Sequence, residues 1–348
     1  MKKIIVYSLI LTVLAGCTSS PKDFPYGVFT DSVSVAPSKV VDLAEHNVLL
    51  GWNFIRHKGW LIFRDGPSIT HNCIKAVSED FTKTLEAVDM GNGPCDVSQS
   101  TRFFLYNDSL FIHDFNLRKI MQLNIENDSI VVSPYKTAIS NMMMNITPIA
   151  ENRFLSLDVR DSSLIRISDL NDSVFCRQPY PHDETLQNME SFTQSAEYVN
   201  TKFTLSPSKD KIAYGCNETG AYGFGRIVSR DSLHFDKLIQ YYSIKNYQLS
   251  GPYVIPDSTH IQNVTDATSS DKYVFFLHHG GERWELFKMI QSHQILVYTW
   301  DGEPYKILTF KENPNLCNIT YDPERNILYG IALNPESQYV EIELDGVL

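Results

Sequence analysis

From residue 36 to the end of the chain, short apolar runs alternate with polar turns, and few stretches have the 3.6-residue spacing of an amphipathic helix. Many runs hold four or five residues that are largely β-branched or aromatic, which is typical of β-strands. Asn, Asp, Gly and Ser, which favour tight turns, separate the runs. The pattern therefore predicts an all-β domain.

Six segments of this domain share one layout, a polar turn followed directly by a strand. The turn residues stand at positions 59, 108, 152, 210, 271 and 326, so the intervals run from 44 to 61 residues. A four-stranded propeller blade occupies about 40–50 residues, and its loops add more. The spacing predicts a six-bladed β-propeller. A seventh blade is the alternative if residues 175–200 contain a weak one, and an open sandwich or large barrel is the competing fold.

The first 35 residues follow a different pattern. Two lysines precede an apolar run at 4–14, and small residues then lead into Cys17 in the order Leu-Ala-Gly-Cys. At about eleven residues the run is too short to cross ~30 Å of hydrocarbon, so it predicts a signal sequence. The four residues that end at Cys17 resemble the lipobox of bacterial lipoproteins. In that class the thiol receives a diacylglycerol, and the new amine of the cysteine is acylated, for example with palmitate.

These patterns predict three parts of the chain. We expect a signal peptide at 1–16, an acylated cysteine and flexible tether at 17–35, and a single β-propeller domain at 36–348. An ordinary secretory signal with a chance cysteine is the alternative. Several acyl chains together hold a protein on a membrane far better than one chain does. The membrane is therefore an expected partner, through the lipid on Cys17.

Charge and cysteine content narrow the class of protein further. The formal net charge is −11, and residues 1–16 contribute two lysines and no acid, which leaves −13 from Cys17 onward. An acidic body without a Lys/Arg cluster repels phosphate backbones, so nucleic acid is not an expected partner. The later cysteines include no CxxC pair, which disfavours a zinc site. We expect buried free thiols rather than a disulfide framework at Cys73, Cys95, Cys176, Cys216 and Cys317.

Two motifs carry a family resemblance. Residues 88–94 (VDMGNGP) resemble the G-x-G-P turn between blades of six-bladed NHL-like and TolB-like propellers. Residues 114–120 (DFNLRKI) resemble the D-x-x-N-x-R-I hairpin of the same group, with Asn116 one place early. The chain looks like the TolB-like propeller lipoproteins of Gram-negative envelopes, which implies the fold and a cell-envelope address. Thr18, in place of the aspartate associated with inner-membrane retention, favours the outer membrane, with the leaflet left open.

Three aspartates recur at one position of the repeat. Asp65, Asp114 and Asp158 lie six residues after the turn residues 59, 108 and 152, respectively. Each is therefore expected at the end of the equivalent strand of its blade. Equivalent positions of a propeller share one rim, so these carboxylates are candidates for a ligand site at the channel mouth. Ca²⁺ is a candidate ligand there, and no other cofactor is expected. The alternative is that each aspartate accepts backbone N–H bonds in its own turn.

Aromatic residues supply the other candidates for ligand binding. Tyr222 and Phe224 lie in the glycine-rich stretch 220–226, and with Trp284 they are candidates for stacking on a sugar or peptide. The alternative is that they pack between blades. The HExxH and GxSxG motifs are both absent from the sequence, so no residue is assigned as catalytic or as a metal ligand.

These observations favour a non-enzymatic binding or scaffolding module on the outer membrane, with a protein or glycan partner. The first alternative is a glycan-active enzyme that uses paired carboxylates at the channel mouth. The second is a structural subunit of an envelope complex, which predicts an exposed apolar patch on one rim.

Overall fold

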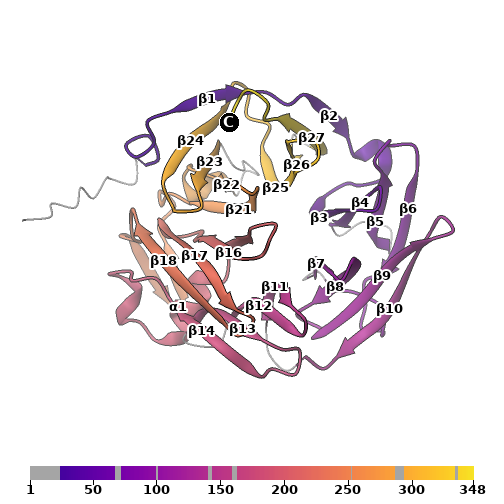
Figure 1. Cartoon of the computed structure of the whole chain (residues 1–348), viewed down its shortest axis with the longest axis horizontal. Helices are drawn as coiled ribbons and strands as arrows, with labels where there is room; N and C mark the ends of the chain where they lie inside the picture. Colours follow the sequence, from indigo (N-terminus) through magenta and orange to yellow (C-terminus); the bar gives the residue numbers. More distant parts are fainter. Residues whose placement is uncertain are drawn as a thin grey trace, which may run out of the picture.

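A computed structural model describes residues 24–66, 72–98, 101–139, 143–158, 163–251, 253–286, 294–333 and 336–348. In this part of the chain, six mainly antiparallel sheets stand around a common centre, as Figure 1 shows. The predicted all-β, six-bladed propeller is therefore confirmed. Apart from two strands added from the start of the described chain, each blade is a meander, in which neighbouring strands of the sequence are also neighbours in the sheet.

The first three blades are four-stranded. Blade 1 consists of β3 (Gly51–His57), β4 (Trp60–Asp65), β5 (Asn72–Ser78) and β6 (Thr84–Asp89). Blade 2 consists of β7 (Thr101–Tyr106), β8 (Ser109–Asp114), β9 (Lys119–Glu126) and β10 (Ser129–Thr137). Blade 3 consists of β11 (Met143–Ala150), β12 (Arg153–Asp158), β13 (Ser163–Ser168) and β14 (Val174–Pro179).

Of the last three blades, blades 5 and 6 include a strand from the beginning of the described chain. Blade 4 consists of β15 (Lys202–Leu205), β16 (Lys211–Gly215), β17 (Ala221–Ser229) and β18 (Ser232–Gln240). Blade 5 consists of β21 (Val264–Ser269), β22 (Tyr273–His278), β23 (Gln294–Thr299), β24 (Pro304–Phe310) and the added β1 (Ser32–Val35). Blade 6 consists of β25 (Leu316–Asp322), β26 (Ile327–Leu333), β27 (Ser337–Glu343) and β2 (Lys39–Asp42).

The ring is closed by pairing between the two ends of the domain. β2 runs antiparallel to β27, with Val40 opposite Val340, and so supplies the outermost strand of blade 6. β1 runs parallel to β24 and extends blade 5. Because β2 shares one sheet with β27, the last strand, opening the ring there requires breaking a ladder of backbone hydrogen bonds.

The turns predicted from the sequence join the first and second strands of each blade. The chain adopts positive φ at several of them, including Gly59, Asn107, Asp108 and Asn326. Gly and Asn, and to a lesser degree Asp, adopt this conformation at little cost. The same local chemistry therefore marks the same place in the blades, which is why the repeat is visible in the sequence.

The intervals vary because two inter-blade connections carry extra elements. The connection from blade 3 to blade 4 contains η2 (Leu186–Asn188) and α1 (Ser191–Tyr198), and η1 (Ala44–His46) precedes blade 1. The connection from blade 4 to blade 5 contains the hairpin β19 (Tyr247–Ser250) and β20 (Tyr253–Pro256). Residues 175–200 thus form the end of a blade and a helical connection, so the alternative of a seventh blade is wrong.

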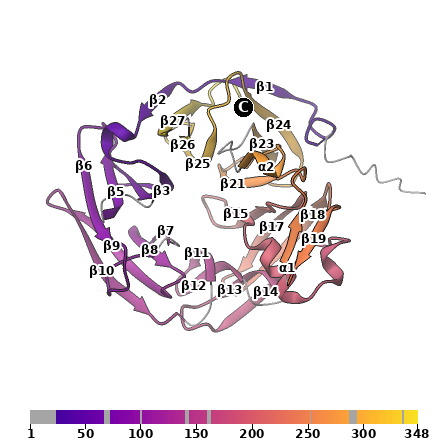
Figure 2. The ribbon, with the colours of Figure 1, turned by 180° about the vertical axis from the view of Figure 1, so that it is seen from behind.

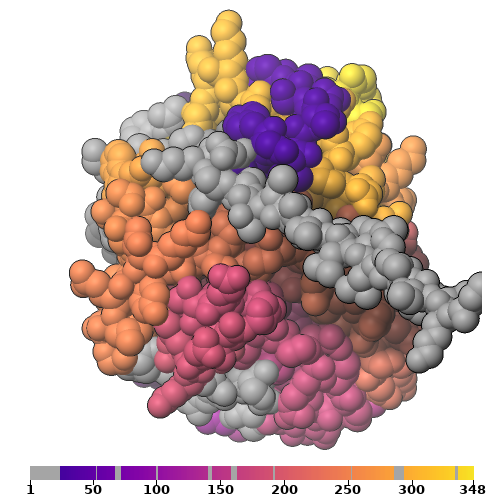
Figure 3. Space-filling model, turned by 90° about the vertical axis from the view of Figure 1, so that its left-hand side faces the viewer, coloured from indigo at the N-terminus to yellow at the C-terminus, as the bar shows by residue number. Residues whose placement is uncertain are grey.

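The tether predicted for residues 17–35 is too long. Phe24 is buried and stacks on Tyr241, with ring centroids 4.4 Å apart. Phe29 is also buried, and its ring lies 5.0 Å from that of Tyr298 in blade 5. In Figure 3 the indigo atoms of the N-terminal segment lie against amber and yellow atoms near the C-terminal end of the chain. The folded body therefore includes residues 24–35, because two aromatic side chains there have apolar surface to cover.

Candidate functional site

Asp65 ends the second strand of blade 1, as predicted, but it does not face an open channel mouth. The side chain is fully buried. One carboxylate oxygen accepts hydrogen bonds from the backbone N–H groups of Leu49, Leu50 and Gly66 at 2.7–3.1 Å. Its role is to hold the connection that enters blade 1.

Asp114 plays the same part in blade 2. It is fully buried, and it accepts hydrogen bonds from the Ser98 hydroxyl at 2.8 Å and the Leu117 backbone N–H at 2.9 Å. The hypothesis that Asp65 and Asp114 converge on a ligand is therefore wrong, and their role as turn acceptors is the correct alternative. Asp158 ends β12 opposite Met143, but its side chain lies outside the described part of the structure.

Tyr222 and Phe224 do not form a surface loop. They lie in β17 and are almost completely buried between blades 4 and 5. The ring of Tyr222 lies 5.2 Å from that of Phe276, and the ring of Phe224 lies 5.3 Å from that of Tyr298. The prediction that they bind a ligand is therefore wrong. Gly223 and Gly225, which alternate with them, allow close approach between strands of blade 4, because a Cβ atom there would lie 2.1 Å from the Tyr214 ring and from the His234 carbonyl oxygen, respectively.

Trp284 lies in α2 (Arg283–Leu286), within the connection between the second and third strands of blade 5. It is half-buried, and its indole N–H donates to Glu282 at 2.6 Å. The ring therefore has a local partner. Its neighbour Arg283, which the sequence did not single out, lines a cavity.

This cavity, which we call the Glu197 cavity, has a volume of about 610 Å³. Its walls come from α1, from the β16–β17 connection, from the β19–β20 hairpin and from α2. Successive strands of a blade run in opposite directions, so the connections after the second and fourth strands emerge on one face of the ring. Figure 2 shows α1, β19 and α2 on that face, at blades 4 and 5.

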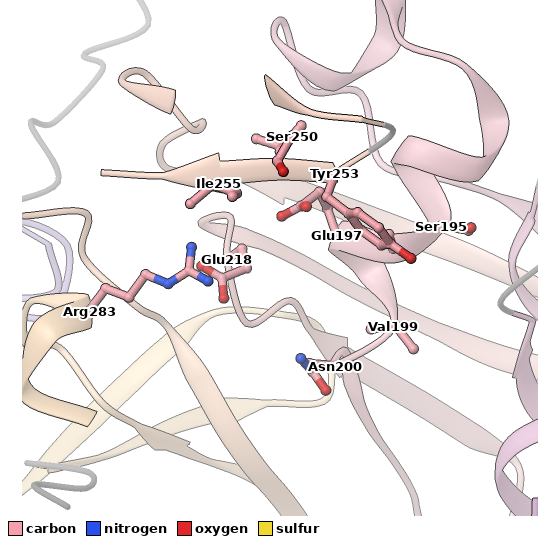
Figure 4. Close-up of a pocket in the computed structure, with 11 residues that line it drawn as sticks. Ser195, Glu197, Val199, Asn200, Glu218, Ser250, Tyr253, Ile255 and Arg283 are labelled. Atoms are coloured by element: carbon pink, nitrogen blue, oxygen red, sulfur yellow. The ribbon is translucent and has the colours of Figure 1, made fainter. Parts of the chain in front are cut away.

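Three charged side chains from three of these elements meet in the Glu197 cavity. They are Glu197 from α1, Glu218 from the β16–β17 connection and Arg283 from α2. Figure 4 shows the Arg283 guanidinium extending toward Glu218, while the Glu197 carboxylate is on the side of Tyr253 and Ile255. Glu197 is 9% exposed and Glu218 is 8% exposed, and burial of two acids in one cavity is costly without a compensating charge.

Glu218 is held in place by polar side chains behind it. Its Oε1 accepts a hydrogen bond from Gln262 Nε2 at 2.8 Å. Its Oε2 takes no hydrogen bond from a described residue and lies 3.6 Å from His260 Nε2. That nitrogen is also 2.7 Å from the backbone carbonyl of Glu218, to which its N–H donates. Burial lowers the pKa of His260, so the neutral imidazole does not neutralise the carboxylate.

Glu197 has an unusual affinity for protons. Desolvation by burial raises the pKa of Glu197, the nearby charge of Glu218 raises it further, and the pKa is about 7. Arg283 and a hydrogen bond from the backbone of Val254 oppose this rise. Near neutral pH the Glu197 carboxyl is therefore a mixture of its two protonation states, as a general acid or a proton-linked binding group requires.

The loop that carries Glu218 depends on a close backbone approach. A Cβ atom on Gly220 would lie 2.6 Å from the Cδ1 atom of Tyr242 and 2.7 Å from its backbone nitrogen. Asn263 fixes the same loop by donating its two side-chain N–H bonds to the carbonyls of Cys216 and Thr219, each at 2.9 Å. A rigid loop of this kind fixes the position of the carboxylate before any ligand arrives.

Sequence reasoning missed Glu197, Glu218 and Arg283. The sequence offers only slight signals: Arg283 directly precedes the candidate Trp284, and Glu218 lies two residues before the glycine-rich stretch 220–226. Their proximity arises only when blades 4 and 5 pack together.

The chemistry that these residues offer is ligand binding or proton transfer. Within the described ranges, no group of three or more His, Cys, Asp or Glu side chains is arranged to hold a metal ion. None of Cys73, Cys95, Cys176, Cys216 and Cys317 is in a disulfide, and three of the five are buried. The prediction of free thiols is thus confirmed, although Cys95 and Cys176 are only half-buried.

A comparison with the WD40 repeats of RRP9 supports the fold. No protein-family model and no curated protein matches the sequence. The WD40 repeats of RRP9 are 9% identical with a TM-score of 0.51, over 90% of this chain and all of that chain. The β-propeller domain of Cps50 (Swd1) from Myceliophteria thermophila is 10% identical with a TM-score of 0.43, over 89% of this chain and 99% of that chain. This chain has the β-propeller fold. Membership of the TolB-like lipoproteins stays a prediction.

The predicted membrane anchor lies outside the described residues. Cys17 and the signal peptide at 1–16 both precede residue 24, where the description begins. In the part of the chain that is described, no helix has the length and apolar content needed to cross a bilayer.

Proposed function

We propose that this chain is a lipid-anchored binding module of a Gram-negative outer membrane, and that its ligand occupies the Glu197 cavity. One observation carries the proposal: a cavity of about 610 Å³ collects two buried acids and an arginine from three separate elements. Small-molecule sites have this form, with apolar walls and a few convergent polar groups. The anchor rests on the lipobox-like residues that end at Cys17.

The cavity is built by additions to the propeller rather than by the blades themselves. α1 and the β19–β20 hairpin lie in the two enlarged inter-blade connections, and α1 contacts β20 directly. Connections vary more easily than a packed core, and a rigid frame that positions such segments is a common design for binding. In Figure 3 the pink segment that includes α1 lies next to orange segments of the following blades.

Ligand-observed NMR with the full-length protein tests the binding proposal. The panel comprises amines, amino acids and monosaccharides, and the variants are Glu218→Gln in the cavity and Glu190→Gln on the exposed start of α1. We expect at least one compound to show saturation transfer that is lost in Glu218→Gln and kept in Glu190→Gln. A panel without binders, or binders that ignore the Glu218 change, would contradict the proposal.

A second candidate function is hydrolysis of a glycan. The observation that favours it is Glu197, whose pKa of about 7 suits a general acid with a second carboxylate nearby. Turnover of p-nitrophenyl glycosides tests this candidate. Hydrolysis with a bell-shaped pH profile, abolished in both Glu197→Gln and Glu218→Gln, would establish the enzyme. Ligand binding without turnover would leave the binding module.

A further inference from the structure

The charges of the Glu197 cavity do not balance. With both carboxylates ionised, Glu197, Glu218 and Arg283 carry a net charge of −1. Among the described residues no ion pair joins Arg283 to either acid, and its Nη1 is buried without a hydrogen-bond partner. The Oε2 of Glu218, whose side chain is 90% buried, is likewise without a hydrogen bond from a described residue. A buried acceptor of this kind is expensive unless a ligand supplies the donor.

The rest of the cavity offers apolar surface. Val199 and Val254 form part of the wall, and the hairpin adds Tyr253 and Ile255, which are 50% and 45% exposed. Large apolar side chains at the edge of a charged cavity favour a ligand with an apolar or aromatic group. The face of a tyrosine ring also attracts cations.

From these contacts we infer that the Glu197 cavity binds an organic ammonium ligand. The ammonium donates to the carboxylates of Glu197 and Glu218, and the attached apolar or aromatic group packs on Tyr253 and Ile255. This inference rests on the proposed binding function and names its ligand class. One ammonium neutralises the net charge of the three side chains, and the net charge of −13 from Cys17 onward attracts cations to the protein.

Ammonium binding is coupled to proton release. A cation beside Glu197 favours its charged form and so lowers its pKa from about 7. Affinity therefore rises with pH up to about 7 and then levels off. The charged and titratable groups around Glu197 are Glu218, Arg283 on α2 and Tyr253 on β20, and His260 lies behind Glu218. Arg166 of the neighbouring β13 is paired with Asp172 at 3.0 Å. Of these, only His260 has an ordinary pKa close to neutrality, and burial lowers it.

Calorimetric titration of the full-length protein at pH 7 tests the inference. The probes are phenethylamine and its neutral counterpart 2-phenylethanol, each in two buffers that differ in ionisation enthalpy. We expect the amine to bind about tenfold more tightly than the alcohol, as a charge-assisted hydrogen bond provides. We also expect release of about half a proton, since Glu197 is about half-protonated at this pH.

Matched variants separate this inference from the proposed function. Proton release should disappear in Glu197→Gln, and amine binding should weaken about tenfold in Glu218→Gln. Glu190→Gln, whose side chain is exposed, should keep both the amine binding and the proton release. Equal binding of the alcohol, or proton release that survives Glu197→Gln, overturns the ammonium inference. Binding of a monosaccharide alone, lost in Glu218→Gln, overturns it but keeps the proposed function. No binding of any probe overturns both.

Discussion

At the scale of single residues, buried carboxylates of this protein serve two different purposes. Asp65 and Asp114 accept hydrogen bonds from backbone N–H groups and hold the connections that enter their blades. Glu197 and Glu218 have fewer donors around them and line a cavity. The number of backbone donors, rather than burial, separates a structural acid from a candidate functional one.

If Asp114 only holds the chain in place, its replacement should lower the stability of the fold without affecting ligand binding. Asp114→Ala should lower the free energy of unfolding by about 2–3 kcal/mol, because the partly buried donors of Ser98 and Leu117 lose their acceptor. Chemical denaturation measures the loss. Asp236→Ala removes an exposed acid that lies 3.2 Å from Arg226, and it should cost less than about 1 kcal/mol. An Asp114 variant that is fully stable but fails to bind ligand would show that the assignment is wrong.

The raised pKa of Glu197 predicts a pH-dependent stability. Between the ordinary value of 4.5 and about 7, the unfolded chain has lost the Glu197 proton while the folded chain retains it. Stability therefore falls as pH rises through this window, and it stays lower above it. Glu197→Gln cannot lose a proton, so it should match the wild type near pH 4.5 and exceed it at pH 8 by up to about 3 kcal/mol.

Denaturation curves at pH 4.5, 6, 7 and 8 measure this difference. Glu190→Gln is the control, because Glu190 is exposed at the start of α1 and makes no capping hydrogen bond. Its difference from the wild type should not change with pH. A constant difference for Glu197→Gln as well would contradict the raised pKa.

At the scale of elements, the sequence predicts the blades well because each first hairpin uses local chemistry. Asn107 and Asp108 have positive φ at one turn, and Asn326 has it at another. Such residues signal a turn without any knowledge of the rest of the fold. The glycine-rich stretch 220–226 misled the interpretation for the same reason, since a glycine is equally suited to a loose loop and to close packing.

The Glu197 cavity could not be predicted from local sequence patterns. Glu197, Glu218 and Arg283 belong to a helix, a strand connection and a second short helix, and no motif links them. Only the packing of blade 4 against blade 5 brings them together. Sequence patterns report periodicity and turns, whereas this cavity depends on contacts between residues that are distant in the chain.

The N-terminal segment is an element whose role can be measured. Phe29→Ala should lower the free energy of unfolding by about 3 kcal/mol, because its buried ring packs on Tyr298. Tyr26→Phe removes only a hydrogen bond to Gln294, so its cost should stay below about 1 kcal/mol. Equal and negligible effects of the two changes would indicate that residues 24–35 are the flexible tether expected from the sequence.

At the scale of the whole molecule, the N-terminal strands help to close the ring and also lie close in sequence to the predicted lipid site at Cys17. β1 and β2 complete blades 5 and 6, and residue 24 is already packed on the body. Only residues 18–23 therefore separate the folded body from the predicted lipid on Cys17. This short spacing would hold the propeller close to the membrane surface.

Replacement of Cys17 tests the anchor without touching the folded body. Cys17→Ala should abolish incorporation of labelled palmitate and move the protein from the membrane pellet to the soluble fraction, since both follow from acylation of the thiol. Its thermal unfolding should match that of the native chain, because Cys17 precedes the described body. Palmitate labelling that persists in Cys17→Ala would rule out this residue as the lipid site.

We expect ligands to bind in the Glu197 cavity and not at Asp65 and Asp114, which end the second strands of blades 1 and 2. The most direct measurement is a crystallographic fragment screen of the mature chain carrying Cys17→Ala. We predict that bound fragments gather between Glu197, Glu218 and Tyr253, with amines contacting the two carboxylates. Fragments that collect around Asp65 and Asp114 and leave this cavity empty would contradict the account.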